Sequence, residues 1–265
     1  MLKITHLTKI FFKGSVNENI VLRNINLFIS PGDFVTIIGS NGAGKTTLLN
    51  IISGVFFPDQ GKIEIDGKDV TNLPEYKRAP FIGRVFQNPL QGTASSLTVE
   101  ENLAIAELRG KRKRLRLAVT RRKRKEFEER LSLLGLGLEK RLQERVGLLS
   151  GGQRQALTIL MATLAKPKLL LLDEHTANLD PKTAQKIIFL TKRVISEVHL
   201  TTLMVTHNME EALKFGNRTI MMNEGKILFD VSGEERKKMS VKDLLDKFSK
   251  LKKEKLSEDK MLLTR

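Results

Sequence analysis

The sequence predicts an α/β fold with a mostly parallel sheet, an N-terminal antiparallel β subdomain and an inserted α-helical subdomain. Short apolar runs typical of buried strands alternate with helical patterns along most of the 265 residues. Such alternation favours a parallel sheet with helices on both faces. One apolar run, at residues 34 to 38, leads directly into a glycine-rich segment at residues 39 to 47. This strand-to-loop transition predicts where a ligand would bind.

The N-terminal part contains short strand-like runs separated by turns. Residues 2 to 12 and 20 to 29 predict an antiparallel hairpin, because a polar turn joins two apolar runs. After the strand at 34 to 38 we expect a helix that ends near Gly54. Further strands are expected at 62 to 65 and 81 to 86.

The helical subdomain is expected at about residues 88 to 165. Thr98 and Glu101 have the spacing of a capping box, and the helical pattern continues through a basic stretch and residues 127 to 138. The strand and helix alternation then resumes. Strands are expected at 169 to 172, 202 to 206, 219 to 222 and 226 to 229, and helices at 181 to 198 and 209 to 215.

Residues 231 to 265 are expected to form a basic helical tail after a main domain at residues 1 to 230. Leu244, Leu245, Phe248 and Leu251 recur there at helical spacing between lysines. This pattern predicts a solvated amphipathic helix that frays.

The net charge of +16 at first suggests nucleic acid or an anionic membrane surface as a partner. Residues 109 to 125, however, contain eleven Lys or Arg and no acidic residue, so most of the excess is local. Two interpretations of this insertion remain open. It is either a solvated charged helix or a contact for anionic lipid headgroups or an acidic partner.

Composition excludes several classes of protein. The chain has no cysteine, which excludes disulfides and Cys-based zinc sites and fits a reducing compartment. The first residues lack the apolar core of a signal peptide, so secretion is not expected. No uncharged stretch approaches the ~20 apolar residues of a membrane span.

The glycine-rich segment fits the phosphate-binding pattern G-x-x-x-x-G-K-[ST]. Glycines in such a loop let backbone N–H groups surround phosphate oxygens, while Lys45 reaches the outer phosphates and Thr46 holds Mg²⁺. The sequence therefore predicts a nucleoside triphosphate site in a P-loop NTPase core. The residues of the predicted loop are Gly39, Ser40, Asn41, Gly42, Ala43, Gly44, Lys45, Thr46 and Thr47.

Four leucines at residues 169 to 172 predict a strand buried on both faces, and Asp173 and Glu174 follow it. Ligands bind at the carboxyl ends of strands in open α/β sheets. In a phosphate-loop NTPase this Asp helps to hold Mg²⁺, and Glu174 is placed to orient or deprotonate the attacking water. For Asp173 taken alone, an acidic loop that caps the strand is the alternative.

A third motif opens the helix after residue 149 and consists of Ser150, Gly151, Gly152 and Gln153. Ser150 and Gln153 fit a capping box, which is a purely structural interpretation. Two glycines in the first turn, however, weaken a helix by about 1 kcal/mol each. This cost favours a helix N-terminus that is exposed to bind an anion.

The Leu-Ser-Gly-Gly-Gln segment, between a phosphate loop and a hydrophobic strand that ends in Asp-Glu, resembles the ATP-binding subunit of an ABC transporter. The resemblance extends over about residues 1 to 230. It implies a RecA-like core, ATP and Mg²⁺ as cofactors, and ATP hydrolysis coupled to transport. His175 stands where the family commonly has proline. Glu-His-Thr-Ala at this position resembles a subgroup of bacterial importers thought to handle aromatic amino acids.

The resemblance also implies roles for single residues. Phe11 would stack on the adenine ring, with Phe12 as the other candidate and core packing as the alternative for either. Gln87 would contact Mg²⁺ or the attacking water and sense the membrane partner. Asp180 would end the loop that crosses between subunits, and His207 would contact the γ-phosphate.

In this family two copies pair head to tail, so Ser150 and Gly152 of one copy would close over the ATP held by Lys45 of the other. The implied partners are permease subunits and an extracytoplasmic substrate-binding protein, and the implied location is peripheral, on the cytoplasmic side of the cell membrane. Import is the expected direction, with an amino acid as the expected cargo.

The alternative is a soluble ATPase of the same superfamily that acts on nucleic acid. DNA-repair members insert long coiled coils between the motifs, whereas Lys45 and Ser150 are only 105 residues apart. Translation-associated members carry two motif sets in one chain, and this chain has one. A nucleic-acid partner is therefore not expected.

Overall fold

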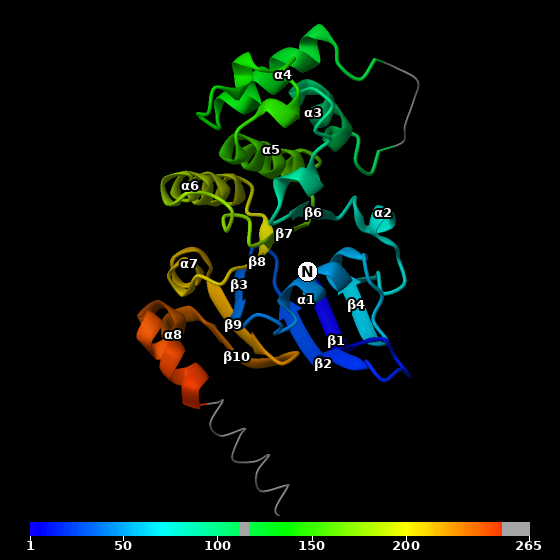
Figure 1. The fold of residues 1–265 in the computed structure, drawn as a ribbon, viewed down its shortest axis with the longest axis vertical. Helices are drawn as coiled ribbons and strands as arrows, with labels where there is room; N and C mark the ends of the chain where they lie inside the picture. Colours follow the sequence, from blue (N-terminus) through cyan, green and yellow to red (C-terminus); the bar gives the residue numbers. More distant parts are fainter. Residues whose placement is uncertain (112–116, 251–265) are drawn as a thin grey trace, which may run out of the picture.

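The computed structural model describes residues 1–111 and 117–250, which form two β-sheets and a helical region (Figure 1). The strands are β1 (Leu2–Phe11), β2 (Asn19–Ile29), β3 (Phe34–Gly39), β4 (Gln60–Ile65), β5 (Lys68–Asp69), β6 (Ile82–Val85), β7 (Leu169–Asp173), β8 (Thr201–Val205), β9 (Arg218–Asn223) and β10 (Lys226–Ser232). The α-helices are α1 (Lys45–Ser53), α2 (Glu75–Arg78), α3 (Val99–Glu107), α4 (Arg121–Ser132), α5 (Gly151–Leu164), α6 (Pro181–Glu197), α7 (Met209–Phe215) and α8 (Gly233–Lys238). Short 3₁₀ turns lie at Pro89–Gly92, Leu138–Lys140 and Val146–Leu148.

The N-terminal sheet has the strand order β2-β1-β4-β5, and its paired strands are all antiparallel. Leu2 pairs with Ile29 and Phe11 pairs with Asn19, so the predicted hairpin is confirmed. The predicted strand at 62 to 65 is the second half of β4.

The main sheet has the order β10-β9-β3-β8-β7-β6. Neighbouring strands from β9 to β6 are parallel, and only β10 at the edge is antiparallel. The predicted α/β class with a mostly parallel sheet is confirmed. Because β3, β7 and β8 are adjacent, the loops that follow them meet at one edge of the sheet.

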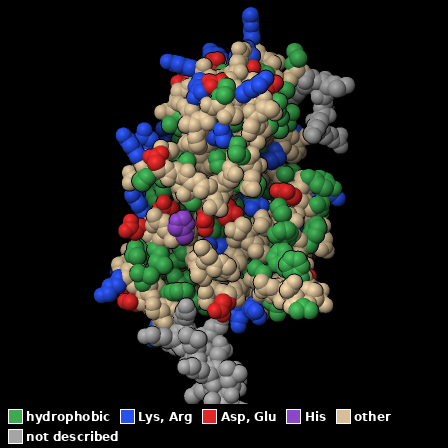
Figure 2. All heavy atoms as spheres, in the orientation of Figure 1, with side chains coloured by type: hydrophobic (Ala, Val, Ile, Leu, Met, Phe, Trp, Pro, Cys, Tyr) green, Lys and Arg blue, Asp and Glu red, His purple; other side chains and the backbone are tan. Residues whose placement is uncertain are grey.

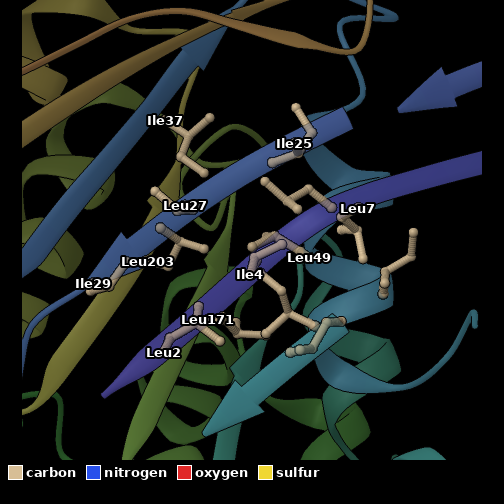
Figure 3. Packing of buried hydrophobic residues seen from close by; sticks show 14 of the residues in the cluster. Leu2, Ile4, Leu7, Ile25, Leu27, Ile29, Ile37, Leu49, Leu171 and Leu203 are labelled. Atoms are coloured by element: carbon tan, nitrogen blue, oxygen red, sulfur yellow. The ribbon is translucent and has the colours of Figure 1, made fainter. Parts of the chain in front are cut away.

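Alternation along β7 divides its leucines between two hydrophobic clusters. Leu169 and Leu171 pack with the N-terminal sheet and α1, while Leu170 and Leu172 pack with the helices on the other face. Figure 3 shows the first cluster, where Leu171 lies among residues of β1 and β2. The strand is therefore buried on both faces, as its four leucines predicted.

The helical region carries one confirmed prediction and one correction. Thr98 and Glu101 form the predicted capping box at the start of α3. The helical segment expected at residues 127 to 138 is shorter, because α4 begins after its N-cap Thr120 and ends at Ser132. Gly135 and Gly137 then adopt positive φ angles of 65° and 73° in the turn that leads to the 3₁₀ helix Leu138–Lys140. Residues 112 to 116 lie outside the described part of the chain.

The basic stretch is partly neutralised by acidic residues of the helical region. Arg124 makes two hydrogen bonds to the Glu100 carboxylate, at 2.6 and 2.8 Å. Lys123 bonds Glu107 at 2.6 Å and Glu126 at 2.8 Å. Lys and Arg side chains also project from this end of the molecule, at the top of Figure 2. Part of the described basic stretch is thus paired within the chain, and the two interpretations of the insertion stay open.

The C-terminal region differs from the predicted fraying helix. Residues 241–250 are helical, and Leu244 is completely buried against Ile38, Ala212 and Met221. Leu244 and Phe248 therefore pack on the main sheet and α7, whereas Leu245 stays half-exposed. Strand β10 also continues to Ser232, two residues beyond the expected end of the main domain. Leu251 lies outside the described residues.

Buried Arg236 ties the C-terminal region to α7. Its guanidinium donates hydrogen bonds to the carbonyls of Ala212 and Leu213 at 2.7 and 2.9 Å. A cation at the C-terminal half of a helix satisfies carbonyls and complements the helix dipole. Among the residues that the structure describes, no helix combines the length and the apolarity of a membrane span.

Candidate nucleotide site

The predicted phosphate loop connects β3 to α1. Gly39 has φ +152°, and a Cβ atom there would lie 2.1 Å from the carbonyl oxygen of Met222. Gly44 precedes the helix with φ +94°, and its Cβ would lie 2.8 Å from the Leu22 side chain. Both positions therefore require glycine for the loop to keep its path.

Lys45 is buried and folds back onto the loop. Its Nζ donates hydrogen bonds to the carbonyls of Gly39 and Ser40 at 2.9 and 3.0 Å. Burial lowers the pKa of Lys45, while the nearby carboxylates of Glu174 and Asp173 oppose the shift. Ser40, Asn41 and Gly42 are exposed at the turn, and Ala43 is buried beneath it.

A hydroxyl and a carboxylate meet beside the loop. The Thr46 Oγ1 atom donates to Asp173 Oδ1 at 3.2 Å, across the gap between α1 and β7. No cluster of three or more His, Cys, Asp or Glu residues occurs within 1–111 and 117–250. Mg²⁺ prefers oxygen ligands and in phosphate-binding sites takes only one or two protein carboxylates besides phosphate and water. The Thr46 and Asp173 pair fits that donor set.

Arg84 of β6 lies on the other side of the same carboxylate. Its Nη2 atom is 3.6 Å from Asp173 Oδ2, and it donates to Asn50 Oδ1 at 2.6 Å. Burial raises the pKa of Asp173, and the positive charge of Arg84 opposes that shift. The motifs did not identify Arg84. The available signal was a charged residue between the buried residues Gly83 and Val85 of a short strand.

Glu174 and His207 approach each other from the ends of β7 and β8. His207 Nδ1 is 3.6 Å from Glu174 Oε2. Glu174 has a φ of +42°, an uncommon conformation for a residue with a side chain, and its N–H donates to the Val205 carbonyl at 3.0 Å. Backbone strain of this kind clusters at functional sites. The Glu174 carboxylate is partly exposed, so water can reach it.

Gln87 and Asp180 lie on the loops that follow β6 and β7, next to Glu174 in the fold. Gln87 is exposed after β6, and its carbonyl accepts a hydrogen bond from Asn178 Nδ2 at 3.3 Å. Asp180 is the N-cap of α6 and accepts from the Thr183 N–H at 3.0 Å. Hydrogen bonds from Thr183 lower the pKa of Asp180, which keeps this carboxylate ionised.

The glycine motif at the start of α5 forms the capping box that the sequence suggested. Ser150 and Gln153 bond each other's backbone N–H, and Arg141 donates to Gln153 Oε1 at 2.7 Å. Gly151 is exposed, but Gly152 is buried, and a Cβ there would lie 2.4 Å from Thr183 Cγ2. Close packing between α5 and α6 is therefore one reason for Gly152.

The aromatic candidates for adenine stacking have different surroundings. Phe11 packs edge-on against Phe56 with ring centroids 5.3 Å apart, and Lys9 lies over its ring at 5.5 Å. Phe12 is 71% exposed at the tip of the hairpin and has a φ of +54°. Phe56 covers part of the Phe11 ring, whereas Phe12 makes no such ring contact among the described residues.

Figure 1 places the two halves of the predicted nucleotide site in different parts of the molecule. α1 lies between the two sheets and begins with Lys45 and Thr46, whereas α5 belongs to the helical region above the main sheet. The structure thus brings together Thr46, Asp173 and Arg84 directly, and Glu174 with His207. Ser150 and Gln153 bond within their own region.

The chain resembles known proteins over most of its length. A tyrosine transport ATP-binding protein from Clostridioides difficile is 47% identical over 248 residues, which cover 94% of this chain and 98% of that protein. Other import ATP-binding proteins are longer, and the chain spans just over half of their length.

Solved structures agree. The dimeric, post-hydrolysis structure of the ATP-binding cassette MJ0796 bound to ADP and Pi has a TM-score of 0.75 and 32% identity, covering 88% of this chain and 98% of that one. CbiO1 from Clostridium perfringens, part of the ABC transporter complex CbiONQ, has a TM-score of 0.75 and 27% identity, with 93% of each chain covered. The family model for ABC transporters matches residues 22–177. The chain therefore belongs to the ABC transporter family, as an ATP-binding cassette that hydrolyses ATP.

Proposed function

We propose that the chain is the ATPase subunit of an importer and works as a head-to-tail homodimer on separate membrane subunits. The observation that carries this proposal is the incomplete site within one chain. Lys45, Thr46 and Asp173 are assembled around the phosphate loop, whereas Ser150 presents an exposed helix N-terminus on the helical region. A second copy would bring Ser150 and Gly152 to the triphosphate held by the first, in an isologous dimer.

The proposed hydrolysis step uses residues at the carboxyl edge of the main sheet. Lys45 would exchange its bonds to Gly39 and Ser40 for phosphate oxygens. Glu174 would orient a water for in-line attack on the γ-phosphate and take its proton. Thr46, Asp173 and Gln87 are the proposed Mg²⁺ contacts, and the bound ion would neutralise charge on the phosphates.

Two further residues would link hydrolysis to closure of the dimer. His207, 3.6 Å from Glu174 and largely exposed, would contact the γ-phosphate. Asp180 ends the loop that begins at Glu174, and we propose that this loop faces the second copy. Loss of the γ-phosphate would then release both contacts, so hydrolysis would reopen the pair.

The proposed cargo is an aromatic amino acid such as tyrosine. The 47% identity to a tyrosine transport ATP-binding protein supports this choice, as does the Glu-His-Thr-Ala segment that contains His175. We further propose permease subunits and an extracytoplasmic substrate-binding protein as partners, which would hold the chain on the cytoplasmic face of the membrane. The structural likeness to CbiO1, a part of a multi-subunit transporter complex, supports this assembly.

Glu174→Gln tests the catalytic part of the proposal. Because amide cannot accept the proton from water, we expect ATP turnover to fall by about 100-fold or more, with ATP binding retained. The variant should accumulate as an ATP-bound dimer in size-exclusion chromatography with light scattering. Glu197→Gln, at an exposed ion pair on α6, is the matched control. Turnover near that of the wild type would remove Glu174 as the base.

Reconstitution tests the transport part. The chain is combined in proteoliposomes with the permease and binding protein from the same genome, and uptake of labelled tyrosine is compared with uptake of a non-aromatic amino acid. ATP-dependent accumulation of tyrosine alone is expected. Tight binding of DNA or RNA with a steep salt dependence would instead support an ATPase that acts on nucleic acid.

A further inference from the structure

Arg84 contacts three elements that surround the phosphate loop. It lies on β6, and its guanidinium donates to Asn50 Oδ1 at 2.6 Å and to Ser53 Oγ at 3.1 Å, both on α1. The same Nη2 atom lies 3.6 Å from Asp173 Oδ2 at the end of β7. One side chain therefore connects β6, the helix that begins with Lys45, and the carboxylate beside Thr46.

The position is a costly one for an arginine. Its side chain is only 10% exposed and its Nε is buried without a hydrogen-bond partner, although a cation–π contact with the Phe86 ring, 4.5 Å away, offsets part of this cost. A buried charge that is incompletely paired destabilises a fold relative to an apolar residue of similar size. Apolar packing therefore gives no reason for a guanidinium here. Asn50 and Ser53 accept its hydrogen bonds, and the Asp173 carboxylate is the partner that carries the opposite charge.

The two oxygens of Asp173 have different partners. Oδ1 accepts from Thr46, and Oδ2 faces Arg84. Rotation of the carboxylate would separate both pairs, so Arg84 and Thr46 together define its plane. Arg84 is in turn held by Asn50 and Ser53, which prevents it from following Asp173 if the carboxylate turns.

We propose that Arg84 is a positioning residue for the magnesium site: it holds the Asp173 carboxylate with Oδ1 turned toward Thr46 and fixes that orientation relative to α1. The inference deepens the proposed ATPase function and rests on it. Because Arg84 lies on the Oδ2 side, at a distance longer than a direct hydrogen bond, it orients Asp173 without occupying the Oδ1 position.

The test measures how much Mg²⁺ strengthens ATP binding. The dissociation constant of a fluorescent ATP analogue is determined in EDTA and in Mg²⁺. The value in EDTA divided by the value in Mg²⁺ is the ratio that reports how many-fold the metal strengthens binding. Partners that orient metal ligands contribute about 10- to 100-fold to metal affinity, so Arg84→Met should lower the ratio by about 10-fold. Binding in EDTA should change little. Arg84→Lys, which keeps the charge, should restore part of the ratio.

Arg109→Met is the matched control. Arg109 lines the same groove as Arg84, a space of about 780 Å³, and its Nε is also buried without a partner. Its guanidinium donates to the Ala162 carbonyl of α5, whereas the guanidinium of Arg84 faces Asp173. We expect this variant to lose stability but to keep the wild-type ratio.

Each outcome decides the matter. An unchanged ratio in Arg84→Met would overturn the inference, and a higher ratio would overturn it by identifying Arg84 as a competing cation. If Arg84→Met does not fold, the double variant Asn50→Ala/Ser53→Ala removes both hydrogen bonds that tie Arg84 to α1, and an unchanged ratio there overturns the inference as well. If Mg²⁺ does not change the affinity of the wild-type protein for the ATP analogue, the proposed magnesium site is refuted, and the inference about Arg84 is refuted with it.

Discussion

His175 makes the stability of the protein depend on pH in a direction that can be calculated. The residue follows Glu174, and its ring is buried against Thr191, with Nε2 3.2 Å from the Thr191 Oγ1. Because the Thr191 hydroxyl donates to the Ile187 carbonyl at 2.8 Å, its oxygen is left to accept a hydrogen bond from Nε2. Burial lowers the pKa of His175 to about 4, so the ring is neutral in the folded state near pH 7.

The size of the effect follows from the two pKa values. The unfolded histidine has its ordinary pKa of 6.5, so between pH 6.5 and about 4 the unfolded state binds more protons than the folded state. The contribution of the neutral ring to the free energy of unfolding is therefore fully present above pH 6.5 and decreases as the pH falls toward 4. At about 1.4 kcal/mol per unit, the loss is about 2 kcal/mol at pH 5 and about 3 kcal/mol at pH 4.

Urea unfolding at pH 7.5, 6 and 5 measures this loss. The wild type should lose about 2 kcal/mol more than His175→Gln between pH 7.5 and pH 5. Raised pKa values of Glu211 and Asp173 act in the opposite direction, and they cancel in this difference. His199→Gln, at an exposed position, should follow the wild type. Parallel curves for wild type and His175→Gln would refute the reasoning.

Two substitutions test packing contacts. In Gly152→Ala the new Cβ would lie 2.4 Å from Thr183 Cγ2. We expect this overpacking to lower the free energy of unfolding by about 1 to 3 kcal/mol. Higher helix propensity should return about 1 kcal/mol of that loss. Adding Thr183→Ala should restore stability, and additive unfolding free energies in a double-mutant cycle would contradict the clash. Leu244→Ala should cost about 2 to 5 kcal/mol where the C-terminal helix packs and should speed trypsin cleavage there. Leu245→Ala, at a half-exposed position, is its control, and equal cleavage rates in the two variants would exclude tight docking.

The sequence predicted those features whose signals are local. The leucine run of β7 specifies a doubly buried strand by composition alone, and the Thr98 capping box specifies a helix start by its spacing. The phosphate loop was identifiable because the glycine positions and Lys45 form one short motif. In each case the physical cause lies within about ten residues of the chain.

Features that depend on distant contacts were not predictable. Leu244 is buried because Ile38 and Met221 form an apolar surface on the main sheet. Met221 is more than 20 residues away in the sequence, and Ile38 lies in the other half of the chain. The same holds for Arg84, whose partners come from α1 and β7. The periodicity of the C-terminal helix gave its apolar stripe but not the surface that covers it.

The division of β7 between two hydrophobic clusters has a consequence for motion. Asp173 and Glu174 sit at the end of a strand whose alternate leucines are fixed in separate cores, so displacing the carboxylates would require both cores to repack at once. Structural change during an ATPase cycle should therefore be concentrated in the elements around this strand. We expect the amides of β7 to be among the slowest in the described part of the chain to exchange with deuterium, and Asp173 and Glu174 to move little during the cycle.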